Sequence, residues 1–205
     1  MKILKISIKG LPHFQYDLNI DFVAQQRVAD DDREQLSNIF SNIYTNPAIS
    51  FIGINASGKT TILKAISFVI ELLNNKPVNN ISSNEIIDDI DSSQKVTFSV
   101  YFYHEGIVYK LKTNIGKKEN MTDGSTKFVI LDETLWSKAV HRIKTKKSLY
   151  NFRDSDLKTE RNNNEEYLME DVSIIVALNK KQDANFSLYD MSEFTDHNML
   201  NVLGR

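Results

Sequence analysis

The stretch ISFIGINASGKTTIL at residues 49–63 decides the fold that we expect for this chain. Its central part, GINASGKT at residues 53–60, matches the pattern of a phosphate-binding P-loop. The mostly apolar residues 49–52 predict a buried strand before the loop. Glycines permit a tight loop whose backbone N–H groups face one anion, and the N-terminus of a following helix adds further donors. The stretch therefore predicts a strand, a phosphate-binding loop and a helix, in this order.

The helix after the loop is predicted from apolar residues at helical spacing. The residues expected on its buried face are Ile62, Leu63, Ile66, Val69, Ile70 and Leu73. At the start of this helix, Lys59 is expected to reach the β- and γ-phosphates and is the candidate catalytic residue. The hydroxyl of Thr60 is expected to bind Mg²⁺.

The loop GINASGKTT at residues 53–61 resembles the G-x-N-x-[SA]-G-K-[ST]-[ST] loop of ABC-type and SMC-like ATPase heads. KILKISIK at residues 2–9, Phe14, and LNIDF at residues 18–22 resemble the paired opening strands of the same heads. Within this group the chain is similar to bacterial AAA-type ATPases of the overcoming-lysogenisation-defect kind and to their anti-phage relatives. The resemblance covers about residues 1–135, and the P-loop is its specific part.

This resemblance implies an α/β fold, the N-terminal P-loop NTPase lobe of an ABC/SMC-type head with an antiparallel β-sheet. It implies Mg·ATP as the ligand, with Thr61 touching the α-phosphate. The expected binding residues are Gly53, Asn55, Ala56, Ser57, Gly58, Lys59, Thr60 and Thr61. The resemblance also implies a homodimer of ATPase heads in a full-length hydrolase, and a role in antiviral defence with an effector nuclease or DNA as possible partner. In these heads the turn at residues 13–14 comes near the nucleotide, which makes His13 and Phe14 weak candidates for contact with it. We favour an exposed turn and a core phenylalanine here.

Composition describes an ordinary globular chain of 205 residues with a net charge of −2. This charge gives no overall signature of nucleic-acid binding. The chain has no cysteine, which excludes disulfides and thiolate metal sites and suits a reducing cytoplasm. No apolar run reaches the length of a membrane span, and the four histidines have no metal-ligand spacing. We therefore expect a cytoplasmic protein without membrane partners or structural metal.

We expect residues 1–205 to form one ATPase lobe with several subregions. Residues 1–75 would form the P-loop subregion, with an opening hairpin from alternating residues 3–9 and 16–22. Residues 23–46 would be an insertion with an acidic loop and a short amphipathic helix. Residues 94–150 would form the antiparallel subregion, starting with a hairpin over residues 95–115, and residues 165–205 a helical segment.

The segment FVILDETLW at residues 128–136 has two interpretations. Four apolar residues before Asp132 and Glu133 match the Walker B pattern, in which the Asp holds Mg²⁺ and the Glu polarises water. Walker B requires a parallel strand beside the P-loop strand, however, and this segment directly follows an antiparallel hairpin. In the resembled family an I-x-x-E-x-L stretch forms the third antiparallel strand, and residues 130–135 fit it. We expect this strand, and keep Glu133 as a catalytic residue only for a complete small NTPase.

Residues 138–161 are rich in lysine and arginine, with acidic residues between them. Such a stretch can contact a phosphate backbone, but the interleaved acidic residues favour a solvated strand pair and loop. A third hypothesis is therefore a non-catalytic module that senses nucleotide or contacts DNA. The signature loop of ABC-type heads is absent, so we expect the N-terminal part of a larger ATPase, binding ATP without efficient turnover. Such a part should expose an apolar sheet edge or helix face.

Overall fold

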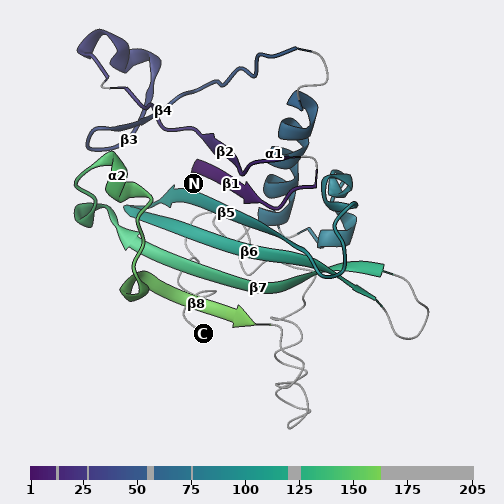
Figure 1. Ribbon diagram of the computed structural model, residues 1–205. Helices are drawn as coiled ribbons and strands as arrows, with labels where there is room; N and C mark the ends of the chain where they lie inside the picture. Colours follow the sequence, from purple (N-terminus) through teal and green to yellow (C-terminus); the bar gives the residue numbers. More distant parts are fainter. Residues whose placement is uncertain (13, 27, 55–57, 75, 120–125, 163–205) are drawn as a thin grey trace.

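The computed structural model describes residues 1–205 except 13, 27, 55–57, 75, 120–125 and 163–205. A six-stranded sheet with the order β2-β1-β5-β6-β7-β8 forms its centre, and every neighbouring pair is antiparallel (Figure 1). The strands are β1 (Lys2–Lys9), β2 (Leu18–Asp21), β5 (Lys95–His104), β6 (Ile107–Glu119), β7 (Thr126–Ala139) and β8 (Leu157–Asn162). The chain is thus a mixed α/β protein dominated by an antiparallel sheet.

Two hairpins predicted from alternating residues are confirmed. The first joins β1 and β2, and the second joins β5 and β6. Only Glu105 and Gly106 separate the paired residues His104 and Ile107 in the second hairpin, and both have positive φ, 43° and 79°. Two successive positive φ values are those of a type I′ turn, whose twist matches that of the strands.

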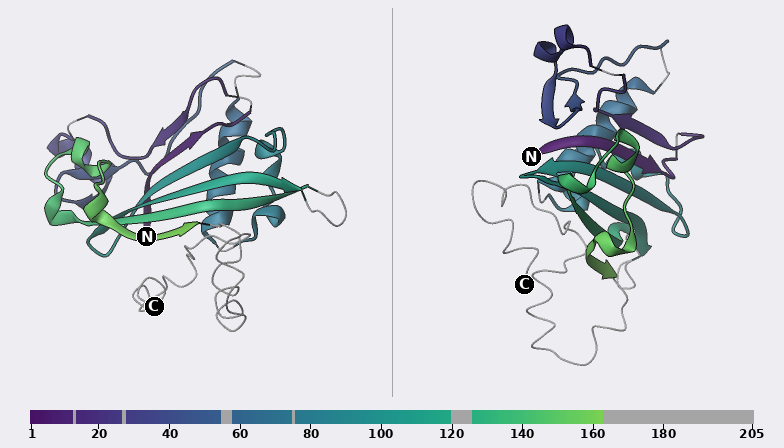
Figure 2. Two further views of the ribbon diagram at one scale, coloured as in Figure 1. Left: turned by 60° about the horizontal axis from the view of Figure 1, so that its bottom comes forward. Right: turned by 90° about the vertical axis from the view of Figure 1, so that its left-hand side faces the viewer.

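The helix α1 (Lys59–Leu73) covers one face of the sheet (Figure 2). Its buried residues are Ala65, Phe68, Val69, Leu72 and Leu73, and the Phe68 ring stacks on Phe98 of β5 with centroids 4.9 Å apart. The 3₁₀ helices η2 (Val78–Asn80) and η3 (Asn84–Ile87) contribute buried residues to the same core. The side chain of Asn79 exchanges two hydrogen bonds with the backbone of Phe128 and so ties η2 to β7.

The predicted helix is confirmed, but its predicted buried face was only partly right. Leu63 and Ile70, assigned to the core from their spacing, are 55% and 38% exposed. Apolar residues surround most of this helix, so the spacing alone could not tell which of them face the sheet. Leu63 and Ile70 thus lie on the outer face of α1, where the polar residues Lys64 and Ser67 are also exposed.

A second, smaller core lies on the other side of the sheet, near the start of β1. It joins the hairpin of β3 (Ser37–Phe40) and β4 (Ile43–Thr45) to the segment after β7. That segment holds η4 (Val140–Arg142), α2 (Lys146–Leu149) and η5 (Asp154–Asp156). Leu4, Val23, Ile43, Val108, Ile143 and Leu149 are its buried members.

The amphipathic helix predicted within residues 23–46 was wrong. Residues 30–35 form the 3₁₀ helix η1 (Asp30–Gln35), and Ile39, Phe40 and Ile43 lie on β3 and β4. Ser41 turns the hairpin with a positive φ of 47°, and its carbonyl accepts a hydrogen bond from the Asn38 side chain. A turn of two residues places Phe40 and Ile43 opposite each other in the hairpin. The same separation of three residues also matches one turn of a helix, so the spacing alone did not distinguish the two structures.

The buried strand predicted at residues 49–52 is also wrong. The described part of this segment has no regular secondary structure and runs outside the sheet toward α1 (Figure 1). Ile52 is 94% exposed. A strand requires a neighbour to satisfy its backbone groups, and no described strand pairs with this segment. The parallel P-loop core is therefore not present in the described residues.

Candidate functional site

The segment with the P-loop pattern, residues 53–60, overlaps the start of α1, which begins at Lys59. Gly58 precedes the helix in the left-handed conformation, with φ of 83°. This conformation costs a residue with a Cβ roughly 1–2 kcal/mol, which explains why the motif places glycine there. The Ile62 N–H donates to the Gly58 carbonyl at 2.9 Å and closes the first helical turn. The N–H groups of residues 59–61 precede this first bond, so they are the donors that a helix N-terminus offers to an anion.

The Lys59 side chain folds back over the loop. Its ammonium donates to the carbonyl oxygens of Gly53, at 2.8 Å, and Ile54, at 2.6 Å. These contacts hold a positive charge against the backbone of residues 53–54, near the N-terminus of α1. No acidic residue lies in the first turn of α1, so nothing on this helix end repels an anion. The Lys59 ammonium thus contacts the Gly53 carbonyl, and Gly58 directly precedes the helix.

Thr60 and Thr61 lie in the first turn of α1, and Thr60 is exposed. A threonine at this position can turn its hydroxyl toward a cation beside a bound phosphate. Asn55, Ala56 and Ser57 lie outside the described residues, so their expected contacts with phosphate stay predictions.

Phe14 lies against the P-loop glycine. A Cβ placed on Gly58 would lie 3.5 Å from the Phe14 ring carbon Cζ. The Phe14 N–H donates to the Leu11 carbonyl at 3.1 Å, which fixes the turn after β1. From the sequence, Phe14 was only a weak candidate for contact with the nucleotide. Its contact with Gly58 joins residues far apart in the chain, so no local pattern reveals it. His13, the other weak candidate, lies outside the described residues.

Asp132 and Glu133 both lie on β7, in antiparallel pairing with β6 and β8. This pairing agrees with the expected third antiparallel strand and differs from the parallel pairing that Walker B requires. Their side chains point to opposite faces, as successive strand residues do. Glu133 is fully buried and accepts a hydrogen bond from the Thr113 hydroxyl at 2.5 Å, whereas Asp132 accepts one from the Asn114 amide. Both carboxylates of this candidate catalytic pair are thus hydrogen-bonded to side chains of β6.

Three cations of the basic stretch are engaged in internal contacts. Lys138 and Lys146 donate to backbone carbonyls, Lys146 to those of residues 24–26. Arg142 forms an ion pair with Asp156. The exposed cations that remain, among them Lys144, Lys147 and Lys158, are scattered over the segment. The sequence missed this arrangement because the partners lie on segments that fold together only in three dimensions.

In the described residues, no group of acidic and histidine side chains is placed to hold a metal ion. No described helix has the length and apolar character needed to span a membrane. Comparison with protein-family models, with curated proteins and with solved structures finds no match for this chain.

Proposed function

We propose that this chain binds Mg·ATP through residues 53–61 and belongs to an ABC/SMC-like ATPase. The contact of Lys59 with the loop carbonyls of Gly53 and Ile54 carries the proposal. A lysine ammonium at the start of a helix, held against the backbone of the preceding glycine-containing segment, suits the binding of a triphosphate. On nucleotide binding, the ammonium would exchange the two carbonyls for phosphate oxygens.

The residues present fit Mg·ATP. The backbone N–H groups at the start of α1 would hold the β-phosphate, Lys59 would neutralise the β- and γ-phosphates, and Thr60 would hold the metal ion. Phe14, beside Gly58, would border the nucleotide. When bound, Mg²⁺ neutralises charge that develops on the transferred phosphate. The chain's own residues bind and orient the triphosphate.

Hydrolysis would need groups outside this loop, because both Asp132 and Glu133 are bonded within the sheet. In the ATPases that this sequence resembles, a Walker B strand and a signature loop supply them. The apolar residues Ile52, Leu63 and Ile70 are exposed around the loop and on α1, which suits further packing at this surface. We infer that this chain binds ATP and that efficient turnover, with head dimerisation and a role in anti-phage defence or DNA transactions, requires such additional parts.

The metal dependence of ATP binding tests the assignment of Thr60. ATP affinity should rise when Mg²⁺ is added to the wild-type chain, and Thr60→Val should lose this rise while keeping metal-free binding. Thr60→Ser retains the hydroxyl and should restore the effect. Equal Mg²⁺ dependence in the wild type and Thr60→Val, measured by calorimetry, would remove Thr60 from the metal site.

A further inference from the structure

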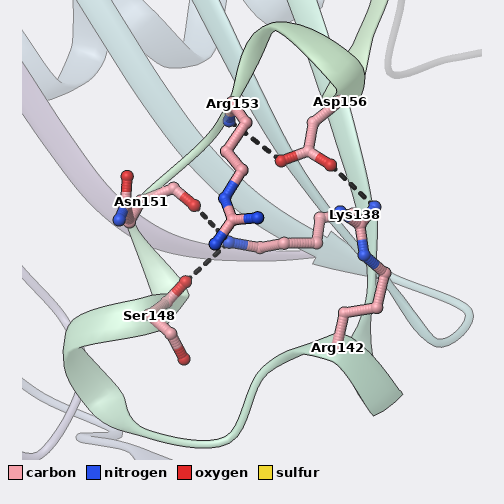
Figure 3. Close-up of a pocket in the computed structure, with 6 residues that line it drawn as sticks. All are labelled: Lys138, Arg142, Ser148, Asn151, Arg153 and Asp156. Carbon is pink, nitrogen blue, oxygen red and sulfur yellow. Dashed lines mark hydrogen bonds and ion pairs between the residues drawn. The ribbon is translucent and has the colours of Figure 1, made fainter.

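A pocket of about 150 Å³ lies between the end of β7 and the segment that follows it (Figure 3). The residues that line it are Lys138, Arg142, Ser148, Asn151, Arg153 and Asp156. Three of them are cations and one is an anion, so the lining has a formal charge of +2. No P-loop residue that the structure describes lines it, and its lining comes from residues 138–156.

Lys138 forms the inner wall of the pocket and is only 5% exposed. Its ammonium donates to the carbonyl oxygens of Ser148 and Asn151, both at 2.6 Å, and lies 4.4 Å from the centroid of the Phe152 ring. These contacts fix the ammonium in place. An ammonium has three N–H donors, and the two carbonyls use two of them.

Asp156 balances one of the three positive charges. Its side chain is 1% exposed, and Arg142 Nη1 lies 2.7 Å from Oδ1. The Arg153 backbone N–H donates to Oδ2 at 3.0 Å. Burial alone would raise the pKa of Asp156, but the Arg153 N–H, Arg142 and Lys138 together lower it. Asp156 is therefore an anion paired with Arg142, and the six lining residues together keep a net positive charge.

Arg153 brings its guanidinium into the pocket, beside the Lys138 ammonium (Figure 3). No hydrogen bond or ion pair joins this guanidinium to the part of the chain that the structure describes. Burial lowers the pKa of Lys138, and the nearby Arg142 and Arg153 lower it further, while Asp156 opposes them. Two like charges thus converge where an anion would relieve their repulsion.

We propose that this pocket binds the phosphate group of a phosphorylated ligand, with Arg153 and Lys138 as its two charged contacts. A phosphate monoester carries a charge of about −1.5 to −2 at neutral pH, which matches the charge of the lining. The planar guanidinium of Arg153 can bind two phosphate oxygens at once. The small volume admits one phosphate group, so a terminal phosphate fits better than a continuous phosphodiester backbone. The terminal phosphate could belong to a small molecule or to a nucleic-acid end.

The test uses the full chain carrying Lys59→Ala, which weakens phosphate binding at the P-loop. Inorganic phosphate is titrated into this protein by calorimetry at low salt. Adding Arg153→Gln should weaken binding at least about tenfold, because it removes the hydrogen bonds of a charged group to the phosphate. Lys147→Gln removes an exposed charge from the same segment outside the pocket and should change affinity less than twofold. Arg153→Lys should recover part of the loss.

The Arg153 side chain is exposed and without a described partner, so these variants should keep the wild-type melting temperature. Absence of phosphate binding in the Lys59→Ala protein, or an equal loss in Arg153→Gln and Lys147→Gln, would overturn the proposal. A short oligonucleotide with a 5′-phosphate is then compared with ribose 5-phosphate and with the same oligonucleotide ending in a 5′-hydroxyl. Stronger binding of either phosphorylated probe than of the hydroxyl form supports the site and identifies its ligand source. Equal binding of all three contradicts it.

Discussion

The Thr113 hydroxyl donates a 2.5 Å hydrogen bond to the carboxylate of Glu133 across the buried faces of β6 and β7. The two residues are also paired in the strand register. Glu133 lies on the same face as Leu111 and Leu135, beneath the helical layer. Glu133 is therefore a buried, hydrogen-bonded residue of the sheet. A local match to the Walker B pattern does not reveal this position, because the pattern does not specify how the strand is paired.

Thr113→Val should destabilise the protein by about 1–3 kcal/mol, because it removes a hydrogen-bond donor from a buried carboxylate. Urea unfolding measures this change. Thr134→Val is the matched control: Thr134 is a neighbouring strand residue on the opposite face, and its hydroxyl makes no hydrogen bond to the described residues. An equal effect of the two substitutions would show that the Thr113–Glu133 bond contributes nothing specific.

Gly10→Ala should destabilise the protein more than Gly106→Ala. Both glycines have φ of 79°, so both substitutions place alanine in the left-handed region, at a cost of roughly 1–2 kcal/mol. At Gly10 the new Cβ would also lie 2.7 Å from the Lys95 carbonyl oxygen, whereas at Gly106 it meets no atom within 4 Å. Denaturant unfolding of the two variants gives the comparison, and equal losses would contradict the close approach of β1 and β5 at Gly10.

The elements predicted well were those with a local cause. Alternating residues and a two-residue turn specified the hairpin of β5 and β6, and the P-loop pattern specified the start of α1. The segment at residues 49–52 failed because a buried strand depends on a partner, which no local pattern supplies. The pocket beneath Arg153 was missed for the same reason, since Lys138 and Asp156 meet only after the segment between them folds back.

The lowered pKa of Asp156 predicts a loss of stability in acid. A carboxyl group whose pKa is lower in the folded state stabilises the fold above its unfolded pKa of about 3.9. That contribution disappears as the pH falls through the lower, folded value. Asp156→Asn should therefore destabilise the protein at pH 7, and this difference from wild type should shrink below pH 4. Asp154→Asn, at an exposed neighbour, should change stability little, and a pH-independent difference for Asp156→Asn would refute this role.

Phe14→Leu should weaken ATP binding more than tripolyphosphate binding. If the Phe14 ring borders the nucleotide beside Gly58, its loss removes an aromatic contact that only the nucleoside part makes. An aromatic contact with a base contributes about 1–3 kcal/mol. Competition with a fluorescent ATP analogue gives both affinities. Equal weakening for the two ligands would mean that Phe14 only supports the loop.

Equilibrium binding of Mg·ATP to the wild-type chain and to Lys59→Ala tests the central claim most directly. Lys64→Ala is the control, because Lys64 lies on the same helix, is exposed and pairs with Glu85 on the surface. We expect binding that falls at least about tenfold in Lys59→Ala, as for the loss of a charged contact, and remains unchanged in Lys64→Ala. Equal affinity of the wild type and Lys59→Ala would contradict the assignment of residues 53–61 as the ATP site.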